Sequence, residues 1–231
     1  MSASPIAAMF DSISPKYDAL NHLLSLNIDK VWRRKTAKAV AKSQPKTILD
    51  LATGTADLAL ALAKRNPQAH LIGMDISEKM LDLGKEKVKQ RNLEYQIELR
   101  LGDAMALPFE GDSFDVVTVA FGVRNFEDLG KGLSEINRVL KPGGQAVILE
   151  FSMPEKFPVK QLYRFYFKRI LPIIGKRVSK DPHAYDYLPA SVERFPKPDG
   201  FLHILVEKGL KNGMKRSLSL GIVTLYKAEK R

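Results

Sequence analysis

The chain has 231 residues, which is enough for one well-buried domain. Apolar residues make up 45% and charged residues 27% of the sequence, so an intrinsically disordered chain is excluded. The sequence has no cysteine, which excludes disulfides, zinc–thiolate sites and covalent cysteine catalysis, and its net charge of +11 favours an anionic partner, either a nucleic acid or a membrane surface.

Residues 1–45 are predicted to form helical arms, with one helix opening at residues 32–35. From residue 46 onward, short apolar runs alternate with helical patterns, which is typical of a parallel sheet covered by helices. Strands are predicted at 47–51, 70–76, 95–101, 114–121 and 144–151. Helices are predicted between them at 56–65, 77–91 and 128–140, and the Lys-Pro-Gly-Gly run at 141–144 is expected to stop the third helix.

After a basic insertion, a helix at 200–211 and two short runs at 215–220 and 222–226, pivoting at Gly221, predict a hairpin at the sheet edge. The whole pattern predicts an α/β, doubly wound, Rossmann-like fold, with a mostly parallel seven-stranded sheet and an antiparallel C-terminal hairpin. We expect a single domain over 1–231, with a helical arm or lid at 1–45, a cofactor-binding core at 46–152, the basic insertion at 153–198 and the C-terminal helix and hairpin at 199–231.

The segment LDLATGTAD at 49–57 lies where a buried strand turns into a helix, the place where doubly wound folds bind ligands. A dinucleotide site would need further glycines, but only Gly54 is present in the turn, which is flanked by Asp50 and Asp57 and has no Lys or Arg. These charges favour a cationic ligand over a polyphosphate. S-adenosylmethionine, which carries a sulfonium and an ammonium, fits this pattern.

Two further acids follow at the ends of the next two strands. Asp75, followed by Ile76, is predicted to accept hydrogen bonds from both ribose hydroxyls, and Asp103 from the adenine amine, with Ala104 keeping the ring pocket narrow. Either acid alone could instead cap the helix or turn that follows it, but the set of three favours a cofactor site. The predicted cofactor contacts are Asp50, Gly54, Thr55, Asp57, Asp75, Ile76, Asp103, Ala104 and Ala120.

These residues resemble the first motif of class I S-adenosylmethionine methyltransferases. More narrowly, the stretch at 102–154, with LPFEGDSFDVVTVAFGVRNFEDLGKGLSEINRVLKPGGQAVILEFSMP, resembles the ubiquinone/menaquinone biosynthesis methyltransferase family, as do 9–35, 185–196 and 221–230. The AFGVRN run at 120–125 is the most discriminating. The sequence departs from the family at Ala56, which replaces the second glycine of a G-T-G-D turn. Because alanine suits the first turn of a helix, we expect cofactor binding to survive.

The resemblance implies a class I methyltransferase fold and transfer of a methyl group from S-adenosylmethionine to a ring carbon of a reduced quinone, converting a demethylmenaquinol to menaquinol. Such a reaction needs a cation or a proton acceptor near the neighbouring hydroxyl. Arg124 is the leading candidate for this catalytic role, with Asn125 orienting the same oxygen and Tyr17, over the site as part of a lid, bonding the substrate hydroxyl. In the alternative interpretation Arg124 pairs with Glu127 or Asp128, and Tyr17 merely anchors the N-terminal arm.

Residues 156–180 contain eight lysines and arginines and no acid. Such a segment is suited to rest on anionic lipid and to line a slot for the prenyl tail of the quinol, although a solvated basic face over an ordinary core fits the pattern as well. The start of the chain lacks the features of a signal peptide, and no apolar run is long enough to span a membrane. We therefore expect a cytoplasmic protein with peripheral contact at the inner face of the cytoplasmic membrane.

Several rival interpretations stay open. The acceptor could be a ubiquinone precursor, 2-methoxy-6-polyprenyl-benzoquinol, instead of or in addition to the naphthoquinol. An RNA methyltransferase would suit the positive charge, but no RNA-binding module is recognisable and no nucleic acid is expected. The chain could also be a non-catalytic S-adenosylmethionine-binding partner. The four histidines have no metal-ligand spacing, so no metal is expected, and a homodimer is left open.

Overall fold

The computed structural model describes residues 5–166, 169 and 183–231. Two helices precede the sheet, α1 (Pro5–Leu24) and α2 (Ile28–Val40). The strands are β1 (Thr47–Leu51), β2 (His70–Asp75), β3 (Ile97–Leu101), β4 (Phe114–Ala120), β5 (Leu140–Phe151), β6 (Leu210–Leu218) and β7 (Val223–Lys230). The remaining helices are α3 (Asp57–Arg65), α4 (Glu78–Lys89), α5 (Leu129–Val139), α6 (Val159–Phe165), α8 (His183–Arg194) and α9 (Pro198–Glu207).

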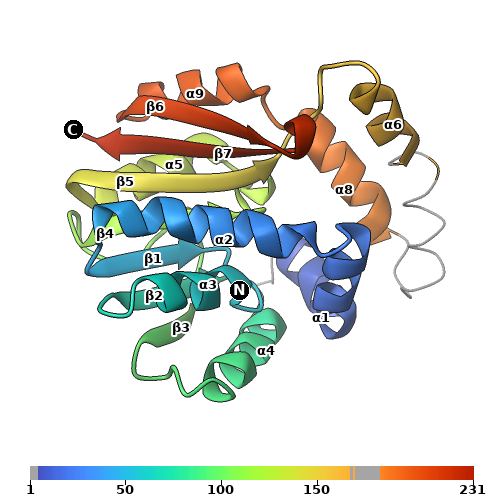
Figure 1. The fold of residues 1–231 in the computed structure, drawn as a ribbon. Helices are drawn as coiled ribbons and strands as arrows, with labels where there is room; N and C mark the ends of the chain where they lie inside the picture. Colours follow the sequence, from blue (N-terminus) through green and yellow to red (C-terminus); the bar gives the residue numbers. More distant parts are fainter. Residues whose placement is uncertain (1–4, 167–168, 170–182) are drawn as a thin grey trace.

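The seven strands form one sheet in the order β3-β2-β1-β4-β5-β7-β6 (Figure 1). The first five strands in this order are parallel, and β7 runs antiparallel to both β5 and β6. The strand order reverses between β1 and β4, which is the switch point where doubly wound folds bind ligands. The predicted fold, with its antiparallel C-terminal hairpin, is confirmed.

Helices cover both faces of the sheet and bury one apolar cluster on each (Figure 1). On the first face, Trp32 of α2 and Leu62 of α3 pack with strand residues such as Val147. On the other, Ile136 of α5 and Phe201 of α9 pack with strand residues that include Tyr226. Because β1, β2 and β4 are buried on both sides, they appear in the sequence as largely apolar runs, whereas the edge strand β3 is mostly exposed and carries charged residues.

Some predicted boundaries were wrong. The third strand begins at Ile97 because Tyr95 is exposed, and β6 begins at Leu210, inside the segment predicted as helix. The third core helix ends at Val139, as the Lys-Pro-Gly-Gly run suggested, but that run belongs to β5, where the register with β4 shifts between Phe114 and Val116.

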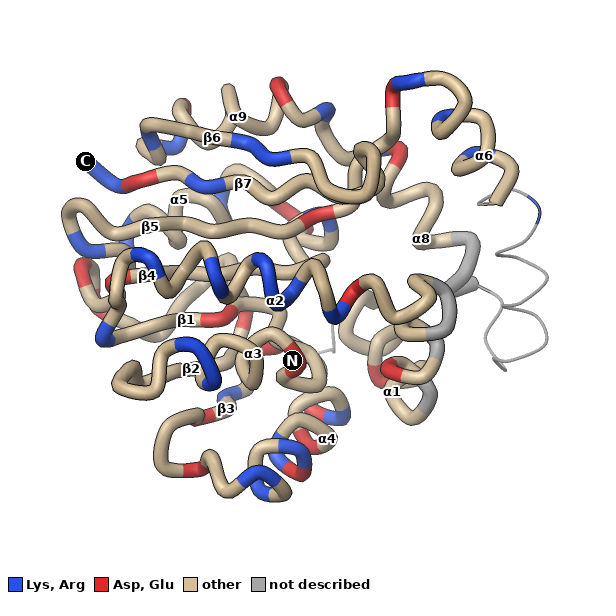
Figure 2. Tube along the Cα trace, viewed as in Figure 1, with Lys and Arg blue, Asp and Glu red and all other residues tan. Residues whose placement is uncertain are grey.

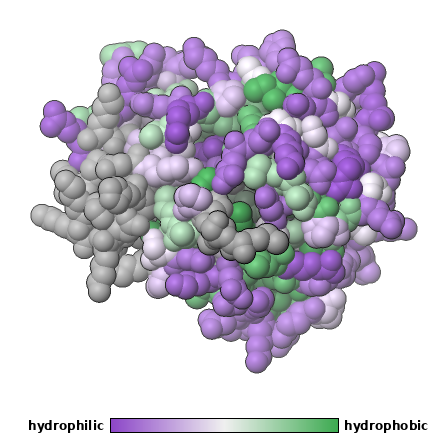
Figure 3. Space-filling model, turned by 180° about the vertical axis from the view of Figure 1, so that it is seen from behind, coloured by the Kyte–Doolittle hydropathy of each residue, from purple (hydrophilic) through white to green (hydrophobic). Residues whose placement is uncertain are grey.

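Helices α1, α6 and α8 lie at the end of the sheet where the parallel strands finish (Figure 1). Figure 3 shows the molecule from behind, with hydrophilic side chains over most of the surface and apolar side chains gathered toward its centre. Among the described helices, none is both long and apolar enough to cross a bilayer.

Candidate active site

The turn between β1 and α3 is built from backbone in the left-handed region. Ala52, Gly54 and Ala56 have φ values of 50°, 55° and 65°. A Cβ atom added at Gly54 would meet no other atom within 4 Å, so this part of the turn faces open space. Ala56 is the N-cap of α3 and not a first-turn residue, so the placement assumed from helix propensity was wrong: a left-handed alanine is disfavoured by about 1–2 kcal/mol. That cofactor binding survives this alanine stays a prediction.

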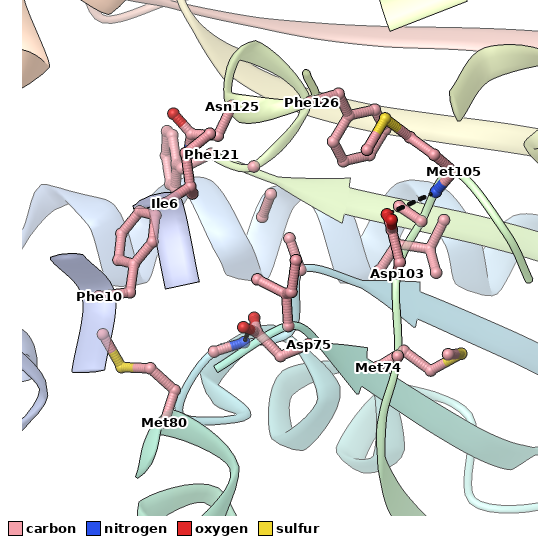
Figure 4. Close-up of a pocket in the computed structure, with 18 of the residues that line it drawn as sticks. Ile6, Phe10, Met74, Asp75, Met80, Asp103, Met105, Phe121, Asn125 and Phe126 are labelled. Atoms are coloured by element: carbon pink, nitrogen blue, oxygen red, sulfur yellow. Dashed lines mark hydrogen bonds between the residues drawn. The ribbon is translucent and has the colours of Figure 1, made fainter. Parts of the chain in front are cut away.

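A first pocket of about 120 Å³ opens beside this turn, at the carboxyl ends of β1, β2, β3 and β4. Asp75 and Asp103 reach it from the ends of β2 and β3, while Ile6 and Phe10 of α1 close the opposite side (Figure 4). The sheet therefore supplies two carboxylates among apolar side chains, and the N-terminal helix supplies an apolar wall.

Both acids are held by backbone N–H groups. Asp75 accepts from Gly54 at 2.7 Å through Oδ2 and from Ser77 at 2.9 Å through Oδ1, and Asp103 accepts from Met105 at 2.8 Å. Burial raises the pKa of Asp75 despite these bonds. Each carboxylate oxygen has a second lone pair, so both acids can still accept hydrogen bonds from a ligand. Both acids therefore bond to backbone near the pocket and line the pocket at the same time, and their contact with a cofactor stays a prediction.

The charge of the first pocket has one sign. Asp75, Asp103 and Glu127 line it, and the described residues of its wall include no Lys, Arg or His. Three carboxylates in a partly enclosed space favour a cationic ligand and disfavour a polyanion. The pocket thus fits the sulfonium and ammonium of S-adenosylmethionine. Glu127 had not been predicted as part of it.

Not all predicted cofactor contacts reach this pocket. Those that line it are Gly54, Asp75, Ile76, Asp103, Ala104 and Ala120. Asp50 lies beneath the turn, where its carboxylate accepts from Thr53 at 2.7 Å and Thr118 at 2.6 Å, and burial raises its pKa to about 6. Thr55 and Asp57 point into a separate charge network. Direct cofactor contact by Asp50, Thr55 and Asp57 stays a prediction.

This charge network joins α1 to the core. Lys87 of α4 contacts Asp57 at 2.7 Å and Asp18 of α1 at 2.5 Å, and Thr55 donates to Asp18 at 2.6 Å. His22 of α1 lies 3.8 Å from Asp57. The contacts fix α1 against the β1–α3 turn.

The same region holds a cluster that could be mistaken for a metal site. His22, Asp29 and Asp57 offer ligand atoms within 4.8 Å of one another. However, Arg33 bonds to Asp29, and Lys87 bonds to Asp57. Because a cation already balances each carboxylate, the arrangement is that of an ion-pair network between α1, α2 and the core.

A second pocket of about 460 Å³ lies next to the first. Phe10, Tyr17 and Phe121 line both pockets, so the two spaces meet at these three rings. The wall of the second pocket is mostly apolar and aromatic. Burial raises the pKa of Tyr17 above its ordinary value of 10, so the phenol stays protonated at neutral pH.

Arg124 lines the second pocket, and protein acceptors fix its guanidinium. Nη1 donates to Glu150 at 2.8 Å and to the Phe121 carbonyl, Nε donates to Ser191 at 3.2 Å, and the group stacks 5.4 Å from the centre of the Phe151 ring. The partner in the ion pair is therefore Glu150, in place of the Glu127 or Asp128 considered from the sequence.

Asn125 turns to the other side and lines the first pocket (Figure 4). Its Oδ1 accepts from the Tyr187 hydroxyl at 3.0 Å, which ties it to α8. Arg124 and Asn125 thus face the two adjoining pockets from one short helical turn, Val123–Asn125. Glu150 was missed by the sequence analysis, although an acid inside the apolar run of β5 is itself a signal of a buried partner.

Comparison with known sequences decides the family. The sequence model of the ubiE/COQ5 methyltransferase family matches residues 2–230. The chain belongs to this family. It is an S-adenosylmethionine-dependent methyltransferase, with S-adenosylmethionine as the co-substrate that membership implies.

Relatives cover almost the whole chain. The demethylmenaquinone methyltransferase of Bacteroides fragilis is 46% identical over 97% of this chain and 92% of its own. The ubiquinone/menaquinone biosynthesis C-methyltransferase UbiE of Geotalea daltonii is 46% identical over 97% and 96%, respectively. The demethylmenaquinone methyltransferase of Porphyromonas gingivalis is 41% identical over 96% and 91%.

Solved structures agree in fold. An S-adenosylmethionine-dependent methyltransferase from Thermotoga maritima, described as a possible histamine N-methyltransferase, matches with a TM-score of 0.68 at 14% identity over 98% of this chain and 100% of its own. An O-methyltransferase family protein from Burkholderia thailandensis matches with a TM-score of 0.70 at 18% identity, over 100% and 64%. At such identities the likeness shows the methyltransferase fold alone.

Proposed function

We propose that this enzyme methylates a ring carbon of a demethylmenaquinol to give menaquinol, in menaquinone biosynthesis. The observation that carries the proposal is the meeting of an acidic pocket and an apolar aromatic pocket at Phe10, Tyr17 and Phe121. A cationic donor suits the first pocket and an apolar ring suits the second, so the reacting groups would meet at these three rings. The demethylmenaquinone activity named for the Bacteroides and Porphyromonas relatives supports the choice of acceptor.

In this proposal the first pocket holds S-adenosylmethionine, which supplies a methyl group carried on a sulfonium. Asp75 accepts from the ribose hydroxyls and Asp103 from the adenine amine, through the lone pairs that the backbone leaves available. The left-handed turn at Gly54 leaves room for the ligand beside the backbone. Ile76, Ala104 and Ala120 complete the apolar part of the wall.

The second pocket receives the quinol ring. A ring carbon becomes a better nucleophile as the neighbouring hydroxyl loses its proton, so a fixed positive charge near that oxygen favours the reaction. Arg124 supplies this charge: Glu150 and Ser191 hold Nε and Nη1, and Nη2 carries two further donors. Tyr17 donates a hydrogen bond to the same oxygen, and Asn125 orients the ring from the side of the donor.

The Arg124→Lys variant tests the role of the guanidinium. Lysine keeps the charge but has a single nitrogen, so it cannot bond Glu150 and Ser191 and also reach the substrate oxygen. We expect turnover to fall at least 100-fold while S-adenosylmethionine binding, measured by calorimetry, changes less than about threefold. Unchanged turnover would remove Arg124 from the mechanism.

The acceptor is tested by methyl transfer from labelled S-adenosylmethionine to chemically reduced, short-chain demethylmenaquinol, with the matching benzoquinol and bulk RNA as parallel substrates. Label in the naphthoquinol alone supports the proposal. Label in both quinols would identify a dual-pathway enzyme, in line with the ubiquinone/menaquinone name of the Geotalea relative. Label only in RNA, or in none of the three, would refute the proposal.

We further propose one methyltransferase domain over 1–231, in which the arm at 1–45 serves as a lid, and a cytoplasmic protein that contacts the anionic face of the membrane through the basic segment 156–180. Within that segment, residues 167–168 and 170–180 lie outside the described residues, so the predicted prenyl slot is supported here by α6 alone. Homodimer formation is a separate question for sedimentation analysis.

A further inference from the structure

The outer rim of the second pocket is apolar and comes from three separate segments. Leu26 and Ile28 lie at the turn between α1 and α2, Leu162 lies on α6, and Leu220 lies in the turn between β6 and β7. All four line the pocket and all four are exposed, with Leu26 and Leu220 each 76% accessible and Leu162 64%. These four residues are called the apolar rim below. The three segments lie at the same end of the molecule (Figure 1).

Two leucines of the apolar rim have a left-handed backbone conformation, which is unfavourable for leucine. Leu26 has φ 51° and Leu220 has φ 59°, in the left-handed region where glycine and asparagine are favoured. Each side chain is exposed, so it gains nothing from the core in return. A strained and exposed leucine at the tip of two different turns indicates a surface that buries these side chains against something outside the chain.

Further exposed groups surround the apolar rim. Phe157 and Phe165, 80% and 59% accessible, extend the apolar surface on the side of α6. Exposed cations lie near both parts in the sequence, Lys30 and Arg34 in α2, Lys156 just before α6 and Arg164 within it. Figure 2 shows such positive positions along α2 and α6. Within residues 26–35 and 153–166, Glu155 is the exposed acid. The surface therefore combines large apolar tips with positive charge, as bilayer-docking surfaces do.

We propose that the apolar rim docks onto the surface of an anionic bilayer, so that the acceptor enters the second pocket directly from the lipid. The inference rests on the proposed function, because it takes the acceptor to be a lipid. The leucines at the two turns insert among the acyl chains, and the cations of α2 and α6 bind lipid phosphates. The mouth of the pocket then opens into the membrane, so the prenyl tail of the quinol stays out of water while its ring enters the pocket.

The test is co-sedimentation of the full chain with vesicles of phosphatidylglycerol and phosphatidylcholine that contain neither quinol nor S-adenosylmethionine. This readout does not depend on the proposed reaction, so the two ideas can fail separately. We expect the wild type to bind these vesicles at low salt and to bind pure phosphatidylcholine at least tenfold more weakly. Equal binding to both compositions, or no binding to either, would overturn the proposal.

The decisive variant is Leu26→Asn/Leu220→Asn. Asparagine suits a left-handed backbone, so the variant should unfold at the same temperature as the wild type or a higher one, and a loss of binding cannot be blamed on misfolding. We expect binding to anionic vesicles to weaken at least tenfold, because two apolar anchors are lost. The matched control is Val206→Asn/Met214→Asn, which removes two exposed apolar side chains away from the rim and should bind like the wild type.

Two results would contradict the docking surface itself. If the rim variant and its control bound vesicles equally well, the apolar rim would not be the contact. If the wild type formed dimers in analytical ultracentrifugation that the rim variant did not form, and neither bound vesicles, the rim would be a surface between two copies of the chain.

Discussion

The ion pair between Glu150 and Arg124 offers the sharpest test of how the site is held. The Glu150 side chain is fully buried and the Arg124 side chain is 8% exposed. Glu150 accepts from Arg124 Nη1 and from the Phe151 backbone at 2.8 Å each through Oε1, and from the Arg124 backbone at 3.2 Å through Oε2. Glu150→Gln keeps the shape but removes the negative charge and places an NH2 donor against other donors.

Removing one partner of a buried ion pair leaves the other charge uncompensated, at about 3–5 kcal/mol. We therefore expect Glu150→Gln to lower the free energy of unfolding by about that amount. At about 2–4 °C per kcal/mol for a domain of this size, Tm should fall by about 10 °C. The double variant Glu150→Gln/Arg124→Met removes both charges and should recover at least half of the loss.

Urea unfolding followed by circular dichroism measures these differences, with Asp82→Asn as the matched control. Asp82 pairs with Lys85 on the surface of α4, where the two side chains are 62% and 55% exposed, and its loss should change the free energy of unfolding by at most about 0.5 kcal/mol. If Glu150→Gln were as mild as the control, or if the double variant were no more stable than the single one, the reasoning would be refuted.

Two further predictions concern the cofactor turn. The pKa of Asp50, about 6 in the folded protein, lies above its ordinary value of 3.8, so ionisation of this buried acid destabilises the fold as pH rises. As the pH rises from 4.5 to 8, the free energy of unfolding of Asp50→Asn should therefore increase by about 2–3 kcal/mol relative to that of the wild type, measured by urea titration. A difference between the two proteins that stayed constant with pH would contradict this. A Cβ at Gly122 would lie 2.4 Å from that of Ala52, so Gly122→Ala should separate β1 from β4 and weaken S-adenosylmethionine binding at least tenfold in calorimetry. Gly200→Ala, with its nearest neighbour at 4.0 Å, serves as the control and should bind normally; equal affinities would refute the prediction.

The parallel strands could be predicted from the sequence to within two residues at most boundaries, because β1, β2 and β4 are largely apolar runs bounded by a turn residue or an acid. The long edge strand β6 could not. After the buried Leu210 the strand continues with Lys211, Asn212 and Gly213, so no alternation of apolar and polar residues marks it. It pairs with β7 alone. Its extent is fixed by pairing with a distant segment rather than by its own residues.

Some residues of the site could likewise be predicted from the sequence, and others could not. Asp75 and Asp103 could be placed from the sequence because they follow strands whose ends must meet at one edge of the sheet. Glu150 could be noticed but not paired, since its partner Arg124 stands 26 residues away and nearer acids compete in the sequence. The backbone angle of Ala56 could not be predicted, because alanine gives no sign of a left-handed turn.

The roof that α1 forms over the first pocket has a kinetic consequence. Ile6, Phe10 and Tyr17 line one side of the pocket, and α1 is held there because Ser77 donates to Asp11 at 2.5 Å and Lys87 pairs with Asp18. If the first pocket holds S-adenosylmethionine as proposed, we expect movement of α1 to influence how fast spent donor is exchanged for fresh donor. Weakening these contacts would then speed exchange and admit water, so that turnover would depend on a helix held by a few polar contacts.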